Sequence, residues 1–149
     1  MVQPKRTTWI VVADGTRAFI LATRGPGTGL APVLSRQHPV PLTHELGTDK
    51  PGRSFNSTHS GTRHAMENVD WHRYEEQKFA HEMAKLLDDA RTRNAFQHLV
   101  LVAPPRTLGE LRGKLDKHTQ ALIAGEIGKD LTRSPIEDLP GYLDGIVRV

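Results

Sequence analysis

The sequence predicts an α/β fold in which helices pack on the faces of a mixed β-sheet. Two observations indicate this fold: three short β-type segments open the chain, and helical and strand-like segments alternate after about residue 68. An initial β-meander followed by interleaved helices and strands is typical of such layered folds. The length of 149 residues suits one domain, which we place over residues 1–149.

The opening meander is predicted over residues 7–13, 17–23 and 31–40. The first segment is short, apolar and rich in β-branched residues, which is typical of a buried strand. Asp14-Gly15 follows it, and this dipeptide favours a tight hairpin turn, so the second strand should run antiparallel to the first. A glycine-rich stretch ends the second strand, and polar residues alternate along the third.

A polar segment interrupts these patterns at about residues 41–68. It contains few apolar residues and shows no sustained period of 2 or 3.6, so we predict a long polar loop. Loops longer than about 12–15 residues are uncommon in compact domains and are usually functional or disordered. The segment is therefore the first candidate for a functional site, with a solvated loop of no specific role as the alternative.

Helices and strands are predicted to alternate after this segment. A long helix should begin at Asn68 or Asp70 and end near Asn94, because apolar residues recur at helical spacing along it. The later elements are expected as a strand over 97–103, a short helix over 107–115, a strand over 122–127 and a last helix that begins at Ser134-Pro135.

Composition excludes several classes of protein. The chain has no cysteine, which rules out a disulfide scaffold, a thiol nucleophile and a thiolate metal site. Its longest apolar runs are only five residues, against about 20 for a membrane span and roughly 7–15 for a signal-peptide core. We therefore expect a cytoplasmic protein with no membrane partner.

Charge is distributed unevenly along the chain. Residues 1–65 carry eight basic and three acidic side chains, a net +5, whereas residues 66–149 carry twelve basic and fourteen acidic ones, a net −2. A basic region attracts phosphate-rich partners through counterion release. The first half is therefore a candidate surface for a nucleic-acid or ribosomal partner.

The polar segment combines arginines, histidines, hydroxyls and glycines, which suits contact with a phosphate backbone. The candidate nucleic-acid-binding residues are Arg53, Ser54, Ser57, His59, Arg63 and His64, with Arg17 and Arg106 extending the basic surface. Catalytic residues are not assigned, but His59 and His64 are candidates for general acid–base work because histidine titrates near neutral pH.

Other chemistries are less well supported by the spacing. The histidines of the segment form no tight i, i+4 pair and no HExxH motif is present, so we expect no metal site and no cofactor. Asp14 ends the first strand, where a nuclease would need two or three further carboxylates nearby. We interpret Asp14 as a turn-forming residue instead.

Several phrases taken together resemble a bacterial family known as the host attachment proteins, which are described as required for attachment to host cells. These phrases are WIVVADGTRAFIL (9–21), KPGRSFNSTHSGTRHAMEN (50–68), HRYEEQKFAHEMAKLL (72–87), LVLVAPPRTLGELR (99–112) and EIGKDLT (126–132). The resemblance covers nearly the whole chain, and the combination of APPRTLGELR with KDLT is its most specific part.

That family is similar to the middle domain of archaeal and eukaryotic peptide-chain release factors, which implies a ribonuclease-H-like fold. In release factors, a Gly-Gly-Gln loop before a long helix promotes hydrolysis of peptidyl-tRNA at the ribosome. The corresponding segment here, residues 50–68, contains no Gly-Gly-Gln. The resemblance thus implies the fold and a ribosome or tRNA partner, and it leaves hydrolysis open.

Three functions follow from these observations. The first is an RNA- or ribosome-associated binding module of the cytoplasm. The second is a hydrolase of peptidyl-tRNA or phosphodiesters that uses the 50–68 segment. The third is an adaptor for a protein partner, needed only indirectly for host attachment.

Overall fold

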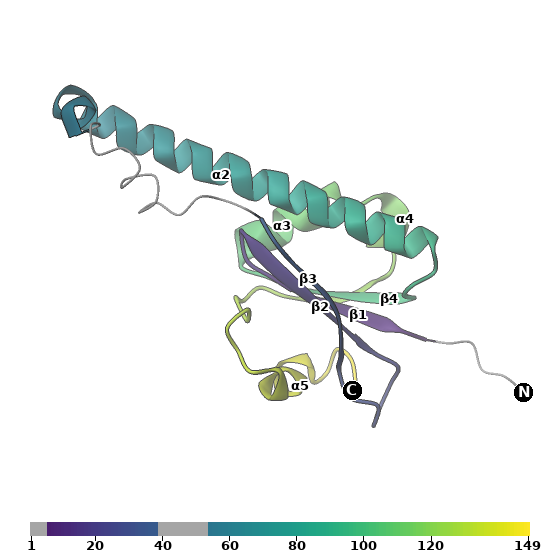
Figure 1. Cartoon of the computed structure of the whole chain (residues 1–149). Helices are drawn as coiled ribbons and strands as arrows, with labels where there is room; N and C mark the ends of the chain where they lie inside the picture. Colours follow the sequence, from purple (N-terminus) through teal and green to yellow (C-terminus); the bar gives the residue numbers. More distant parts are fainter. Residues whose placement is uncertain (1–5, 39–53) are drawn as a thin grey trace, which may run out of the picture.

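The structure is a computed structural model that describes residues 6–38 and 54–149, and over residues 54–70 it describes the backbone only. Its centre is a five-stranded mixed sheet of order β3-β2-β1-β4-β5 (Figure 1). The strands are β1 (Thr8–Ala13), β2 (Arg17–Thr23), β3 (Ala31–Gln37), β4 (His98–Val102) and β5 (Ile123–Ile127). The first three are antiparallel neighbours, whereas β4 runs parallel to β1 and β5 parallel to β4. The predicted α/β fold with an N-terminal antiparallel meander is confirmed.

Strand β1 lies in the middle of the sheet, and all six of its residues are buried. Its β-branched and apolar side chains point alternately to the two faces, as the period of a strand requires. Trp9 lies opposite Leu99 of β4, and Val12 lies opposite both Phe19 of β2 and Val102 of β4. The strand thus supplies both hydrophobic cores.

Helices cover the two faces unequally (Figure 1). One face is covered by α2 (Ser54–Thr92), α3 (Pro105–Lys114) and the short α4 (Lys117–Gln120). Of the described elements, only a 3₁₀ turn, η2 (Ile136–Asp138), and α5 (Leu139–Leu143) lie on the other face. We call these the α2 face and the α5 face. Within the described segments, none of the helices combines the length and hydropathy that a bilayer span requires.

The packed half of α2 follows the predicted periodicity. Phe79, Met83, Leu87 and Ala90 are buried against the sheet, and the helix ends at Thr92, close to the predicted end. Asn94 adopts a positive φ of 59°, a left-handed conformation that asparagine tolerates and that stops a helix.

The start of α2 differs from the prediction. The helix begins at Ser54 instead of Asn68 or Asp70, so residues 54–68 are helical and their assignment to a polar loop is wrong. Residues 54–68 lack the apolar periodicity by which a helix is recognised in a sequence. Helix propagation needs only one backbone bond per residue once a packed segment has nucleated it. The rest of the predicted loop, residues 41–53, lies outside the described residues.

The remaining elements agree with the sequence in outline. The short helix α3 and the strand β5 are found where they were predicted. The last predicted helix is divided into η2 and α5. Helix α4 was not predicted. It begins because the Asp116 carboxylate accepts a hydrogen bond of 2.8 Å from the amide of Thr119.

Candidate functional site

The parallel strands β1, β4 and β5 all end at one side of the sheet, which we call the carboxyl edge. The register places Val12 opposite Val102, and Val102 opposite Ile127. The loops that follow these three residues therefore lie next to one another. In open α/β sheets this edge is where ligands usually bind.

Asp14 organises the first of these loops. Its Oδ1 atom accepts bonds of 2.9 Å from the amides of Thr16 and Arg17, and its Oδ2 atom accepts a bond of 2.8 Å from Arg17 Nε. Burial by itself raises the pKa of Asp14, but the bonds from Thr16 and Arg17 outweigh it, so the pKa lies below 3.8. Asp14 is therefore an ionised turn residue that holds the Arg17 side chain in place.

The same carboxylate links the β1–β2 turn to the segment that follows β5. Thr132 Oγ1 lies 3.4 Å from Asp14 Oδ2 and 2.5 Å from Asp130 Oδ1. The amide of Thr132 also donates to Asp130 Oδ1 at 3.0 Å. The bond between Thr132 and Asp14 joins residues 118 positions apart in sequence. Side chains therefore hold two loops of the carboxyl edge together.

Basic side chains are concentrated at the carboxyl edge. Arg17 follows β1, Arg106 is the second residue of α3 after β4, and Lys129 follows β5. Arg106 and Lys129 are exposed, and 40% of the Arg17 side chain is exposed. Loops 14–17, 104–107 and 128–133 contain four basic and two acidic residues. These three loops by themselves therefore carry a net charge of +2.

The N-terminal half of α2 continues past this edge (Figure 1). Glu76 lies directly against Gly15, where no Cβ could fit, so the helix crosses the sheet margin at the β1–β2 turn. Residues 54–75 continue the helix from this crossing point towards its N-terminus. This stretch forms an arm that projects from the same side of the sheet as the carboxyl edge.

The predicted nucleic-acid-binding residues are distributed over these features. Arg17 and Arg106 lie together at the carboxyl edge. Five others lie on the backbone of the arm, namely Ser54, Ser57, His59, Arg63 and His64. Arg53 lies outside the described residues. The two described groups therefore lie on the same side of the sheet, one at the carboxyl edge and one on the arm.

His38 anchors the arm to the sheet and was missed by the sequence analysis. It is 8% exposed and follows β3, and its amide donates to Thr16 O at 2.7 Å. Its Nε2 atom donates to Glu75 Oε2 at 2.5 Å, and Nδ1 lies 3.7 Å from Glu82 Oε2. The ring packs at 6.0 Å from that of Phe79. The helical spacing of Glu75, Phe79 and Glu82 could have indicated a shared face, but the sequence does not identify His38 as their partner.

The described side chains do not form a metal-binding cluster. In residues 6–38 and 71–149, no three histidine, aspartate or glutamate side chains converge in a way that could hold a metal ion. Asp14, the carboxylate at the end of β1, is engaged by amides and by Arg17. The basic side chains at the carboxyl edge can bind an anion.

A comparison with known protein families shows to which family the chain belongs. A family described as "Protein required for attachment to host cells" matches residues 9–143. The chain belongs to this family. The resemblance to the host attachment proteins inferred from the sequence phrases is confirmed, and it covers the sheet, α2 and the carboxyl edge alike. No curated protein sequence matches the chain.

Three solved structures are similar to the chain at low sequence identity. A structure titled "Archaeal protein" is similar over 99% of this chain and 36% of its own, with 12% identity and a TM-score of 0.52. An archaeal translation termination factor, aRF1, matches over 86% of this chain and 32% of its own, with 14% identity and a TM-score of 0.44. A PilM–PilN type IV pilus biogenesis complex matches over 86% and 37%, with 18% identity and a TM-score of 0.38. The chain spans about a third of the length of each.

Proposed function

We propose that this member of the host attachment family is an RNA- or ribosome-associated binding module. The observation that carries the proposal is the position of Arg17, Arg106 and Lys129 on three adjacent loops of the carboxyl edge. Closely spaced basic groups bind the phosphate backbone and release its counterions. A ribonuclease-H-like fold is part of the proposal, and the strand order β3-β2-β1-β4-β5 supports it.

Arg17 is the best-positioned phosphate contact of this surface. A guanidinium has five N–H donors, and the bond to Asp14 uses the Nε donor. The bond fixes the orientation of the side chain, which reduces the entropy lost when a phosphate binds. Arg106 and Lys129 then add charge on one side of Arg17, because β4 pairs with β1 and β5 follows β4 in the sheet.

The arm of α2 supplies the second group of contacts in this proposal. Arg53, Ser54, Ser57, His59, Arg63 and His64 would reach phosphates further along the same nucleic acid. A projecting helix can enter a groove or a cleft of a folded RNA that the compact sheet cannot reach. The anchor at His38 and Glu75 would hold the arm in a fixed direction.

An RNA or ribosomal partner places the proposed function in the cytoplasm. Attachment to a host cell would then depend on the protein indirectly, through translation. A protein-adaptor role is the alternative, and co-purification of the native protein discriminates between them. Recovery of ribosomal RNA or tRNA supports the proposal, whereas recovery of proteins alone contradicts it.

A salt titration of RNA binding tests the interface itself. The affinity for tRNA or ribosomes should fall steeply with salt concentration, and Arg106→Ala should reduce the logarithmic slope by about 0.7 for an unpaired strand or 0.9 for a duplex. Lys129→Ala should act similarly. Arg93→Ala is the matched control, because Arg93 is exposed at the opposite end of α2.

The outcomes of this titration are distinct. An affinity that does not depend on salt, or an Arg93→Ala loss equal to that of Arg106→Ala, would contradict the proposed interface. The same preparation also tests hydrolysis of a peptidyl-tRNA surrogate. Turnover that disappears in both His59→Ala and His64→Ala would establish the hydrolase instead of a pure binding module.

A further inference from the structure

The outer side of α2, which faces away from the sheet, carries two exposed aromatic side chains. Trp71 is 36% exposed and Tyr74 is 60% exposed. They are three positions apart in sequence, so they are neighbours on the surface of the helix. Neither of them belongs to the hydrophobic clusters that hold the helices on the sheet. The packing of the fold therefore does not account for these two large rings.

Basic side chains continue the row that the two rings begin. Lys78 lies four positions after Tyr74, and Lys85 lies seven positions after Lys78, which is about two turns of helix. Both lysines are exposed, as is His81 between them. Spacings of three and four positions keep these side chains on one side of α2, opposite its buried residues. We call this set the aromatic–basic row: Trp71, Tyr74, Lys78, His81 and Lys85.

Charges in this part of α2 are separated between its two sides. Residues 71–87 contain three glutamates and three arginines or lysines. The carboxylates of Glu75 and Glu82 turn to the ring of His38, at 2.5 Å from Nε2 and 3.7 Å from Nδ1. Glu76 lies against Gly15 at the β1–β2 turn. The acidic groups of this stretch are therefore directed toward the sheet, whereas its arginine and lysines are exposed.

Exposed rings beside basic groups suit a single-stranded nucleic acid. Unpaired bases stack on aromatic side chains, and the phosphates between them are attracted to basic groups. The bases of a duplex are already stacked on one another, so they offer no free face to a ring such as Trp71. A protein partner that packed on the row would need apolar residues along its whole length, but only histidine and lysines follow Tyr74 in it.

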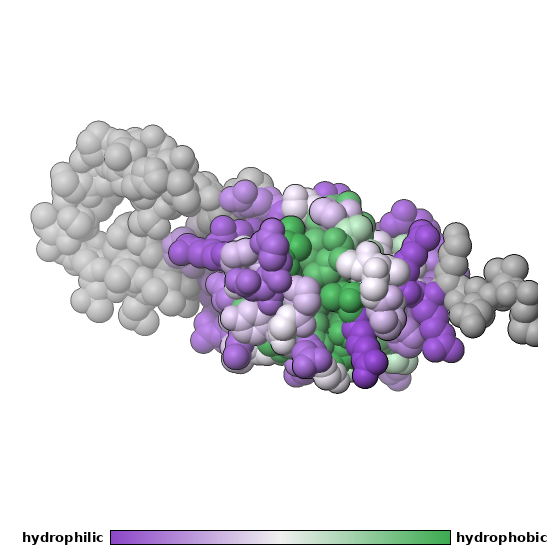
Figure 2. Space-filling model, turned by 90° about the horizontal axis from the view of Figure 1, so that it is seen from below, coloured by the Kyte–Doolittle hydropathy of each residue, from purple (hydrophilic) through white to green (hydrophobic). Residues whose placement is uncertain are grey.

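The α5 face does not offer this combination of groups. Figure 2 shows apolar surface at its centre, bordered by hydrophilic residues. Glu137 and Asp138 are exposed there and would repel a phosphate. The exposed ring of Tyr142 already has the Lys129 Nζ atom over it, at 5.6 Å from its centroid. Of the surfaces that the described side chains form, the outer side of α2 is therefore the better one for unpaired bases.

We infer that the aromatic–basic row of α2 binds a short single-stranded segment of RNA. Bases stack on Trp71 and Tyr74, and phosphates contact Lys78 and Lys85. The inference rests on the proposed RNA-binding function and adds a second surface to it. The carboxyl edge contacts phosphates alone, whereas the row also recognises that bases are unpaired. The row extends over about 21 Å of helix, at 1.5 Å per residue.

The probe for this surface is an oligouridylate of about eight nucleotides, within the usual site size of roughly 4–16 nucleotides. Its binding to the full-length protein is followed by tryptophan fluorescence. The chain has two tryptophans, and Trp9 is only 6% exposed, so quenching by a stacked base reports on Trp71. We expect saturable quenching. An abasic strand of the same length and charge should bind at least about fivefold more weakly, because it has no base to stack.

Substitutions along the row separate stacking from charge. In fluorescence anisotropy with labelled oligouridylate, Trp71→Ala and Tyr74→Ala should each weaken binding at least about fivefold. Tyr74→Phe should retain the affinity, because the ring remains. Lys78→Ala should reduce the logarithmic salt slope by about 0.7, the value for one phosphate contact with a single strand.

Two matched controls lie outside α2. Ile136→Ala removes an exposed apolar side chain and Arg24→Ala removes an exposed basic one, and neither should change the affinity. Thermal unfolding of every variant, followed by circular dichroism, shows directly whether α2 is retained. Because Tyr74 is largely exposed, the comparison of Tyr74→Ala with Tyr74→Phe tests stacking without disturbing the core.

Three outcomes would overturn the inference. The first is equal affinity for the abasic strand, and the second is unchanged binding in both Trp71→Ala and Tyr74→Ala. The third is that these two variants lose a co-purifying protein and keep the RNA, which would make a protein the occupant of the row. If any of these occurs while Arg106→Ala still lowers the salt slope for tRNA, the row is wrong and the proposed function stands. If neither oligouridylate nor tRNA binds, both are wrong.

Discussion

The two faces of the sheet are built from the same strands but are covered to different extents. The cluster on the α2 face contains 17 buried hydrophobic residues, whereas the cluster on the α5 face contains eight. Alternate residues of β1 contribute to both, since Val11 belongs to the first cluster and Val12 to the second. The difference therefore comes from the covering elements: long amphipathic helices on one side, and a short C-terminal segment on the other.

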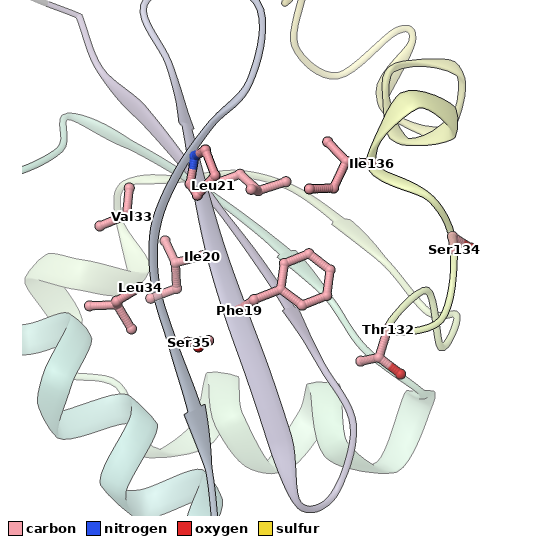
Figure 3. Close-up of a pocket in the computed structure, with 10 residues that line it drawn as sticks. Phe19, Ile20, Leu21, Val33, Leu34, Ser35, Thr132, Ser134 and Ile136 are labelled. Carbon is pink, nitrogen blue, oxygen red and sulfur yellow. The ribbon is translucent and has the colours of Figure 1, made fainter.

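The two faces differ in how many hydrophobic side chains they bury. The α2 face buries the larger cluster, which includes Phe79, Met83 and Leu87 from the C-terminal half of α2. On the α5 face Ile136 is 43% exposed, and it lines an apolar groove together with Phe19 and Leu21 (Figure 3). We conclude that the α2 face anchors the long helix, whereas the described residues cover the α5 face less completely.

The largest expected effect comes from truncating one leucine on each face. Leu87→Ala on the α2 face should lower the free energy of unfolding by about 4 kcal/mol, because densely packed neighbours cannot close the cavity. Leu139→Ala on the α5 face should cost about 2–3 kcal/mol, because its surroundings adjoin open space and relax more easily. Urea unfolding of both variants measures the difference. A larger loss in Leu139→Ala would contradict the comparison.

A second prediction concerns the attachment of the arm to the α2 face. His38→Ala should lower the free energy of unfolding by about 1–3 kcal/mol, because it leaves the Glu75 carboxylate without its 2.5 Å partner in a largely buried position. Glu82→Gln is the control: Glu82 lies 3.7 Å from the ring and its side chain is 54% exposed, so its loss should be under about 0.5 kcal/mol.

Hydrogen exchange of the α2 amides distinguishes this anchor from general packing. Exchange near Glu75 should become faster in His38→Ala while the amides around Leu87 remain protected. Equal losses of stability in His38→Ala and Glu82→Gln would show that the short contact with Glu75 does not anchor the arm.

A third prediction tests how closely the C-terminal segment packs on the α5 face. A Cβ at Gly125 would meet Ile146 Cγ2 at 2.5 Å, so Gly125→Ala should destabilise the protein by about 1–2 kcal/mol through overpacking. Addition of Ile146→Ala to this variant should remove most of the clash, which a double-mutant cycle in urea detects as coupling. Additive effects of the two changes would mean that Ile146 does not cover β5.

The smallest effect concerns pH and the β1–β2 turn. Because the folded pKa of Asp14 lies below its usual value of 3.8, this carboxylate contributes stability above the unfolded pKa. That contribution is lost as pH falls below about 4 and through the folded pKa. Asp14→Asn should therefore lose less stability than the wild type between about pH 5 and pH 3. Identical acid sensitivity of the two proteins in urea unfolding would exclude this role.

The sequence predicted most of the sheet because its strands are short, apolar runs bounded by turn residues. Asp14-Gly15 indicated the first hairpin, and the structure confirms it through the bonds that Asp14 makes. The start of α2 was misplaced because residues 54–68 lack the apolar periodicity by which helices are recognised. Helix α4 was missed because four residues are too few for a periodic signal.

The residues of the candidate site could likewise be predicted only in part from the sequence. Arg17 and Arg106 could be selected from the sequence as basic residues beside strands, and residue type alone sufficed for that choice. Their proximity could not be predicted, because it depends on the parallel pairing of β1 with β4. The paired residues, such as Thr8 and His98 or Val12 and Val102, are 90 positions apart in sequence. His38 was not recognised, since Glu75 and Glu82 are separated from it by 37 and 44 positions.

The sequence by itself determined the class of fold, the turn at Asp14, the packed face of α2 and the membership of the host attachment family. These are encoded locally, in the period of apolar residues, in turn chemistry and in contiguous phrases. Only the tertiary structure decided which loops share the carboxyl edge, how His38 anchors the arm, and where the α5 face stays uncovered. Those features arise from strand pairing and from the reach of covering segments, which bring together residues whose sequence separation hides any relation between them.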